Sequence, residues 1–203
     1  MRTELARHEG GAALIEAALL LPVMLLLLFG LIEISLYGWT SGLSAKAVQL
    51  GVRRAVLSDA VAVGPGLDPA ESATYWDGLS PGRRCFPEPG GVSACPVFSV
   101  VCDVADGCRC TGSPCRFRFS AARLAPVLAA MRAVMPNLKL ENIRVSYTTN
   151  GLGYVQRPVP VPVDVGVTLV RVAYRPLLLG QLLGDTLPIR ASARQPGESL
   201  ATR

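Results

Sequence analysis

Histidine is almost missing from this chain of 203 residues, because His8 is the only one. A Ser-His-Asp or Cys-His catalytic arrangement, and every metal site that needs an imidazole, would have to rely on this single side chain. His8 lies close to the N-terminus, ahead of a long apolar run, and no nucleophile motif accompanies it. We therefore expect no enzyme, no cofactor and no bound metal.

Charged residues are also sparse, at 17% of the chain, and the formal net charge is +5. The basic residues occur singly or in pairs such as Arg53–Arg54 and Arg83–Arg84. Blocks of lysine and arginine, which bind nucleic acids or anionic lipids, do not occur. A solvated surface accounts for the positive charge, and we expect no nucleic-acid partner.

Motifs for phosphate binding and carboxylate chemistry are weak. Gly151-Leu152-Gly153 lacks the third glycine and the strand–helix context of a dinucleotide-binding loop. Asp103 and Asp106 lie among cysteines and form a candidate carboxylate pair, but solvated loop positions are the simpler interpretation.

The chain does have a long apolar run near its N-terminus. Sixteen residues without a charge separate Glu16 from Glu33. The wider apolar segment, residues 12–37, is 26 residues long, which is enough to cross a hydrocarbon core of ~30 Å with some tilt. A cleavable secretory signal has a basic start and a shorter apolar core. The run therefore predicts a transmembrane segment over residues 12–37.

A short motif precedes this run: Gly11 to Glu16 reads Gly-Ala-Ala-Leu-Ile-Glu. A carboxylate at membrane depth is costly and usually faces a partner. The stretch GGAALIEAALLLPVMLLLLFGLIEISLYG resembles the N-terminal segment of TadE-like proteins, the minor pilins or pseudopilins of tight-adherence (Flp-type) pilus systems. The resemblance covers roughly residues 10–52. Ala17 stands where the major pilins of these systems usually have an aromatic residue, which favours a minor component.

The resemblance implies a prepilin-type leader, residues 1–11, cut between Gly11 and Ala12 by a prepilin peptidase on the cytoplasmic side. Cleavage would place the new amine of Ala12 four residues before Glu16, and positions i and i+4 share a helix face. The two charges could pair within one chain or between neighbouring subunits. The implied partners are the peptidase, other pilin or pseudopilin subunits, pilus assembly proteins and the membrane. An unprocessed single-pass anchor is the alternative, and it leaves Glu16 without a role.

Charge alone does not determine the topology. Arg2 and Arg7 precede the run, whereas Lys46, Arg53 and Arg54 follow it, so the positive-inside rule would place the C-terminal part in the cytoplasm. The cysteines and the cleavage motif argue for the opposite side. We expect a bacterial inner-membrane protein with one span and a periplasmic C-terminal domain, either retained there or incorporated in the pilus at the cell surface.

All six cysteines lie in the Cys-rich loop expected over residues 85–115, within a stretch rich in proline and glycine. An even number of cysteines in a loop-rich segment outside the membrane predicts disulfides, although the fifteen pairings stay open. Cys85–Cys95 is a candidate short loop, and Cys108–Cys110 is disfavoured by bridge geometry. The alternative zinc site would have poor ligand spacing. The candidates are Cys85, Cys95, Cys102, Cys108, Cys110 and Cys115.

The remaining pattern predicts an α+β fold. The N-terminal helix should continue over residues 38–58, with an apolar stripe that excludes Ser44 and packs on a domain formed by residues 59–203. A second helix is expected over residues 120–135, regular from Pro126 onward. Strands are expected at residues 115–119, 143–149, 159–169 and 187–194.

The expected architecture is a long transmembrane and assembly helix packed on a small, mostly antiparallel, pilin-like sheet, with a disulfide-stabilised loop region. The functional alternative to a minor pilin is a single-pass envelope protein, neither processed nor assembled, whose periplasmic domain binds a ligand or a protein.

Overall fold

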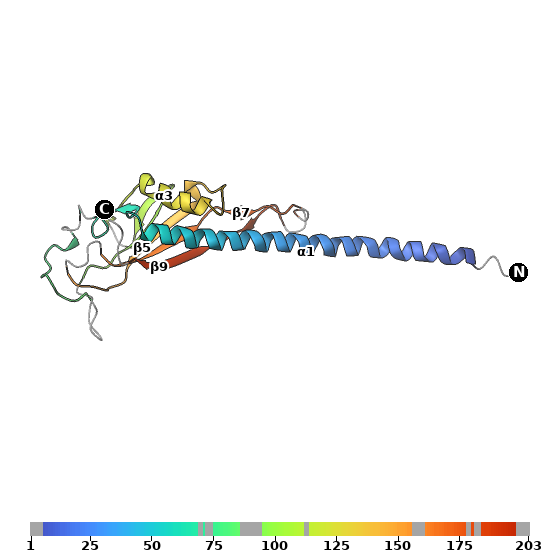
Figure 1. Cartoon of the computed structure of the whole chain (residues 1–203), viewed down its shortest axis with the longest axis horizontal. Coiled ribbons are helices and arrows are strands. Elements are labelled where there is room, and N and C mark those ends of the chain that lie inside the picture. Colours follow the sequence, from blue (N-terminus) through green and yellow to red (C-terminus); the bar gives the residue numbers. More distant parts are fainter. Residues whose placement is uncertain are drawn as a thin grey trace. The chain divides into compact units, whose positions relative to one another are not determined.

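The computed structural model describes residues 6–68, 71, 75–85, 95–111, 114–155, 161–177, 180 and 184–197 (Figure 1). The chain divides into two compact units. The first unit contains the chain up to Thr40 together with Ala173–Pro188, and the second contains Ser41–Val172 and the residues from Ile189 onward. Residues 1–5 of the expected leader lie outside the described residues.

The elements follow the order of an α+β chain. They are α1 Ala6–Val56, β1 Ala62–Val63, β2 Ser99–Asp103, β3 Gly107–Cys110, β4 Arg118–Phe119, α3 Ala121–Arg132, the 3₁₀ turn η2 Leu140–Asn142, β5 Ile143–Thr149, β6 Val163–Leu169, β7 Ala173–Tyr174, β8 Leu187–Pro188 and β9 Ser192–Gly197. A long apolar N-terminal helix and an antiparallel sheet confirm the expected α+β class.

The second unit is built on a five-stranded antiparallel sheet with the strand order β3-β2-β5-β6-β9. Its side chains alternate between the two faces because successive residues of a strand point to opposite sides. In β5, Ile143, Val145 and Tyr147 are completely buried, whereas Arg144 and Ser146 between them are partly exposed. The apolar face of the sheet thus forms the core of this unit.

The C-terminal part of α1 packs on this core, as the apolar stripe predicted. Ala47, Val48, Val52 and Ala55 are each at most 4% exposed. Ser44 is buried as well, so its expected place off the stripe was wrong. The buried face is therefore wider than the apolar residues alone indicate.

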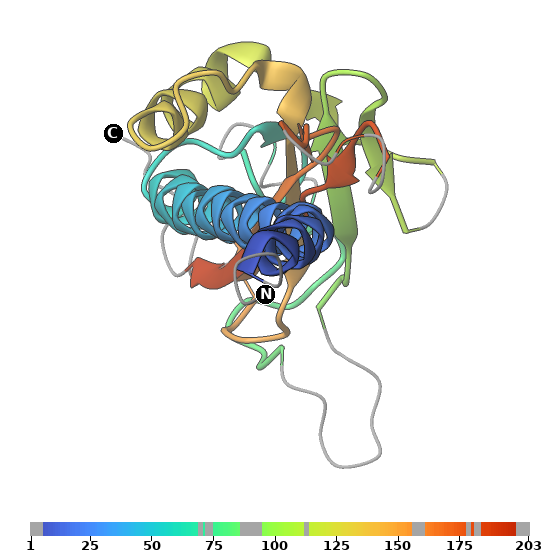
Figure 2. The same ribbon diagram turned by 90° about the vertical axis from the view of Figure 1, so that its right-hand side faces the viewer.

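Helix α3 lies beside this part of α1 (Figure 2). Gly51 makes the close approach possible, since a Cβ at this position would lie 2.7 Å from Sδ of Met131. The expectation that α3 becomes regular only at Pro126 was wrong, because α3 begins at Ala121 and contains Pro126 in its interior. Burial of Leu124, which is fully enclosed, offsets the backbone hydrogen bond that the proline cannot donate.

Two expectations about strands need correction. The Cys-rich segment is not entirely loop, because β2 and β3 form a hairpin inside it. The strand expected over residues 187–194 is two strands: β8 pairs with β7, whereas β9 pairs with β6. The strand expected over residues 115–119 is shortened to β4, Arg118–Phe119, because its partner β1 is only two residues long. The start of the strand expected at residue 159 lies outside the described residues, and β6 begins at Val163.

Candidate functional site: the N-terminal helix and the contacts of Glu33

The expected processing junction lies within α1, which begins at Ala6. Gly11 is exposed, and a Cβ built there would meet no atom within 4 Å. Ala12 follows it in the helix, but its side chain lies outside the described set. Glu16 is exposed one turn further on. Gly11 of the junction and the Glu16 side chain are therefore both accessible to another molecule.

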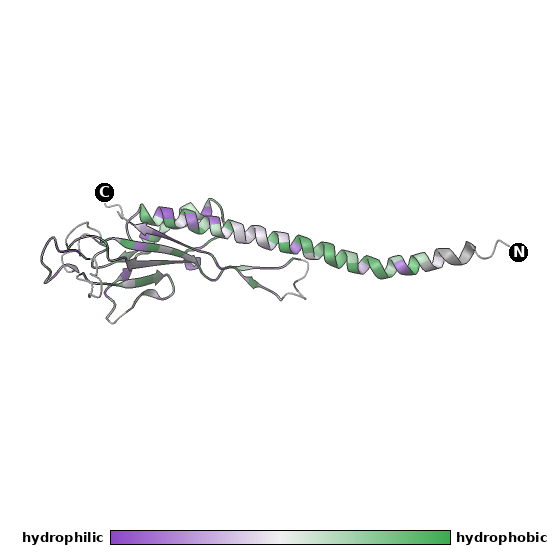
Figure 3. Cartoon of the chain, turned by 90° about the horizontal axis from the view of Figure 1, so that it is seen from below, coloured by the Kyte–Doolittle hydropathy of each residue, from purple (hydrophilic) through white to green (hydrophobic). Residues whose placement is uncertain are grey.

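The helix beyond Glu16 presents apolar side chains to its surroundings. Every side chain from Ala13 to Phe29 is exposed, and the ribbon of this part of α1 is coloured mostly as hydrophobic in Figure 3. Among the described helices, α1 is the one long and apolar enough to cross a membrane. A helix that is apolar all round is buried in a core or spans a membrane. Since no other described part of the chain covers this stretch, lipid or neighbouring helices are the environments that suit it.

Glu33 is the first buried side chain that follows this exposed stretch of α1, and it is only 1% exposed. Its carboxylate accepts a short hydrogen bond from the Tyr174 hydroxyl. The backbone N–H of Leu177 lies 3.1 Å from Oε1 and 3.2 Å from Oε2 of Glu33. Burying a carboxylate is costly unless it is hydrogen-bonded, and these donors supply that compensation. Sequence reasoning used Glu33 only to mark the end of the apolar run.

The Tyr174 side chain contacts two residues of α1, Glu33 and Tyr37. Its ring contacts that of Tyr37 edge to face, with centroids 5.7 Å apart. The hydrogen bond to Glu33, together with burial, raises the pKa of Tyr174 to about 12. The phenol therefore stays protonated at neutral pH and remains a donor to the carboxylate.

Tyr174→Phe is expected to loosen this contact. Because one donor to Glu33 is lost, hydrogen exchange at the Leu177 amide should quicken by on the order of tenfold. Hydrogen-exchange mass spectrometry of the full chain in detergent measures this. Tyr154→Phe is the matched control, since Tyr154 is exposed and lies in the second unit. Equal exchange in both variants would mean that the hydroxyl does not hold the segment.

All six cysteines form disulfides: Cys85–Cys95, Cys102–Cys108 and Cys110–Cys115. The candidate loop Cys85–Cys95 is thus present, and the disfavoured Cys108–Cys110 bridge is not. Cys102 and Cys108 are directly opposite each other in the β2–β3 hairpin, so their bridge links the two strands. Among the described residues, no three His, Cys, Asp or Glu side chains gather as metal ligands would.

Thiol titration of the unreduced protein is expected to detect no free thiol. The double variant Cys102→Ala/Cys108→Ala should lose about 2–3 kcal/mol of unfolding free energy, because the bridge restricts the unfolded chain. Urea unfolding of both proteins in the same detergent measures the difference. Two or more free thiols per unreduced chain would contradict the pairing.

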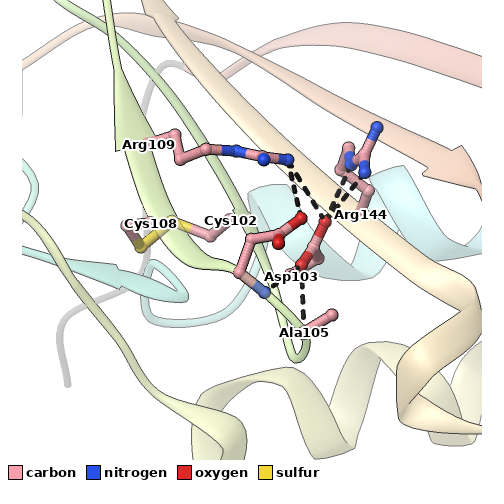
Figure 4. A network of polar contacts seen from close by, with 7 residues as sticks. Cys102, Asp103, Ala105, Cys108, Arg109 and Arg144 are labelled. Carbon is pink, nitrogen blue, oxygen red and sulfur yellow. Dashed lines mark hydrogen bonds and ion pairs between the residues drawn. A yellow bond between two sulfur atoms is a disulfide. The ribbon is translucent and has the colours of Figure 1, made fainter.

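Asp103 is buried, so its interpretation as a solvated loop residue was wrong. Arg144, its partner across β2 and β5, donates to Oδ2 of Asp103 from Nε at 3.0 Å and from Nη2 at 2.9 Å (Figure 4). Oδ1 accepts the backbone N–H groups of Ala105 and Asp106 at 3.1 and 2.8 Å. Arg109 bridges Asp106 at 2.8 Å and lies 4.0 Å from Asp103. The carboxylate therefore closes the turn of the hairpin and has a structural role.

An open cleft of about 430 Å³ lies in the second unit. Its aromatic side chains touch one another: Phe98 lies 5.9 Å from Tyr75 and 4.9 Å from Phe117 between ring centroids. Asp77 and Arg116 add one charge of each sign. Sequence reasoning did not find this cleft, because its residues come from three separate segments that carry no common motif. The lining residues are Pro65, Tyr75, Asp77, Pro96, Phe98, Cys110, Thr111, Pro114, Arg116 and Phe117.

Comparison with known families bears on the exposed helix rather than on the cleft. Residues 11–53 match the family model described as TadE-like protein. The chain carries a TadE-like segment. This segment covers about a fifth of the chain, begins at the expected junction glycine and ends near the C-terminus of α1. No curated protein and no solved structure matches the chain.

The TadE-like segment confirms the resemblance inferred from the residues around Glu16. It indicates involvement in Tad/Flp pilus systems and association with pilus assembly components. The apolar helix in the same segment is a candidate membrane span, consistent with a membrane-anchored pilus protein. Both indications fall on the same stretch of α1, which contains Gly11, Glu16 and Glu33.

Proposed function

We propose that this protein is a minor pilin or pseudopilin of a tight-adherence (Flp-type) pilus system, which supports pilus biogenesis and surface adherence. The observation that carries the proposal is the TadE-like match over residues 11–53, on a helix whose side chains from Ala13 to Phe29 are not covered by the other described residues. Such a helix has two suitable environments, a lipid bilayer and a bundle of similar helices. A pilin uses the first before assembly and the second afterwards.

In this proposal a prepilin peptidase cuts between Gly11 and Ala12 on the cytoplasmic side of the inner membrane. The new N-terminal amine and the Glu16 carboxylate then neutralise each other, within one subunit or between neighbours. The exposed position of Glu16 supports the second arrangement, because a neighbouring subunit can reach it. Pairing removes two isolated charges from an apolar bundle, where each would be costly.

The rest of the chain would form a periplasmic domain that contacts other pilus components. Its three disulfides support an oxidising compartment, since disulfides persist outside the reducing cytosol. We propose no enzymatic activity, because the only histidine lies in the leader.

Deletion of the gene in its host tests this function. We expect few or no surface pili and weakened adherence, both restored by the full-length gene supplied in trans. Normal piliation and adherence in the deletion strain would contradict a role in pilus biogenesis.

The aromatic cleft favours a second candidate, a single-pass envelope protein whose periplasmic domain binds a ligand or a protein. The volume of the cleft and its three contacting aromatic rings suit a small apolar group or a peptide side chain. This candidate predicts normal piliation in the deletion strain and no processing at Gly11. The deletion experiment therefore separates the two candidates.

A further inference from the structure

The position of Glu33 along α1 defines one boundary of the apolar span. Ala13 to Ile32 are 20 residues with one charge, Glu16. At ~1.5 Å per residue they extend for ~30 Å, which equals the thickness of a bilayer's hydrocarbon core. If the helix spans the inner membrane as proposed above, Glu33 lies where hydrocarbon meets the headgroups on the periplasmic side.

The segment after β7 is held at this same level. The Leu177 N–H is hydrogen-bonded to the Glu33 carboxylate, and the Tyr174 hydroxyl donates to it as well. These contacts lie within the first unit and fix the segment to one turn of α1. Whatever surrounds the helix at Glu33 therefore also surrounds residues 174–177.

Two side chains of this segment are free to meet that environment. Leu177 is 75% exposed although its backbone N–H is engaged, and Arg175 is exposed two positions earlier. On α1, Trp39 is 71% exposed and follows Glu33 by six residues, or ~9 Å of helix. Tryptophan is typical of the headgroup level, and an arginine can extend to lipid phosphates while its stem stays on apolar surface.

We propose that residues 175–177 form a second membrane contact, in which Leu177 enters the periplasmic leaflet and Arg175 binds phospholipid phosphate. The proposal rests on the membrane insertion of α1 proposed above. Lipid fits better than a protein partner, because the exposed Leu177 side chain is held beside Glu33, at the end of the proposed span. The contact anchors the β7–β8 hairpin on the bilayer while the subunit is in the membrane, and extraction into a filament would release it.

The test uses the full chain in vesicles of phosphatidylethanolamine and phosphatidylglycerol. Single nitroxide labels are attached without reductant to Leu177→Cys, Leu25→Cys and Leu57→Cys, since all native cysteines form disulfides. Leu177→Cys keeps the backbone N–H bonded to Glu33. Leu57 is the matched control, because it is a similarly exposed leucine that directly follows α1. Accessibility to oxygen, which partitions into lipid, is compared with accessibility to a water-soluble nickel chelate.

We expect the Leu177 label to shift toward oxygen and away from the nickel chelate relative to Leu57, with Leu25 shifted further. A water-like Leu177 label beside a lipid-embedded Leu25 label would overturn the second contact and leave the span intact. Water-like labels at both sites would overturn the membrane insertion itself. The Leu177 label could instead be protected from both oxygen and the nickel chelate, with the protection lost when the protein is diluted with lipid. That result would indicate that a second copy of the chain covers Leu177, which also contradicts the proposal.

Discussion

Glu16→Gln is expected to reduce surface pili to near the level of a deletion strain while the protein still inserts in the membrane. The substitution keeps the size of the side chain but removes the charge that would pair with the amine of Ala12. In an apolar helix bundle that amine would then be left without a counter-ion, and its burial is strongly unfavourable. Electron microscopy of surface filaments and immunoblotting of membranes measure the two effects.

The control for this prediction is Glu71→Gln. Glu71 lies in the second unit and forms an exposed ion pair with Arg118, so its loss should leave piliation unchanged. Normal pili in the Glu16→Gln strain, at equal protein levels, would remove Glu16 from the assembly mechanism.

Asp103→Ala is expected to cause the largest loss of stability, about 3–5 kcal/mol of unfolding free energy. The carboxylate is almost fully enclosed, and it binds Arg144 and two backbone N–H groups at the turn between β2 and β3. Its removal leaves Arg144 without its ion pair and the turn without its acceptor. Asp106→Ala is the matched control and should cost less than about 1 kcal/mol, because the pair of Asp106 with Arg109 is exposed.

Acid should reproduce part of this effect. Burial alone would raise the pKa of Asp103, but the hydrogen bond from the Asp106 N–H and the contacts with Arg144 outweigh it and lower the pKa below the usual value. The stabilisation is therefore complete above pH ~4, the value of an unfolded aspartate, and is lost as the pH falls through the lower pKa of the folded protein. Urea midpoints measured between neutral pH and pH 3 should fall more steeply for the native chain than for Asp103→Ala. Parallel curves would contradict this role.

Local patterns predicted the parts of the fold that depend on near neighbours. Helix α1 ends at Val56, close to the expected end at residue 58, because its apolar stripe has the helical period. Strand β5 occupies residues 143–149 as expected, since Ile143, Val145 and Tyr147 alternate with polar residues.

The errors arose where tertiary contacts override local pattern. Apolar residues recur at every second position over residues 187–194 without interruption, because β8 and β9 both have the strand period of two. The pattern therefore does not indicate that the strand is divided, although β8 pairs with β7 and β9 pairs with β6. The β2–β3 hairpin has a turn signal of its own, Asp103 to Gly107, in which Gly107 has a φ of 69°. The cysteines on either side of that turn favoured a loop interpretation and obscured it.

The candidate site divides in the same way. Gly11 and Glu16 form a motif within six residues, so the sequence alone could suggest their role. The partner of Glu33 is Tyr174, which is 141 positions away. No pattern in a single sequence indicates a contact over that distance, and only the folded chain brings the two side chains together.

The most direct test of the account is the intact mass of the protein expressed with and without its cognate prepilin peptidase. We predict that the peptidase removes residues 1–11, leaving Ala12 as the N-terminus, and that Gly11→Val blocks this cleavage. Full-length protein under both conditions would contradict the prepilin interpretation and leave α1 as a plain membrane anchor.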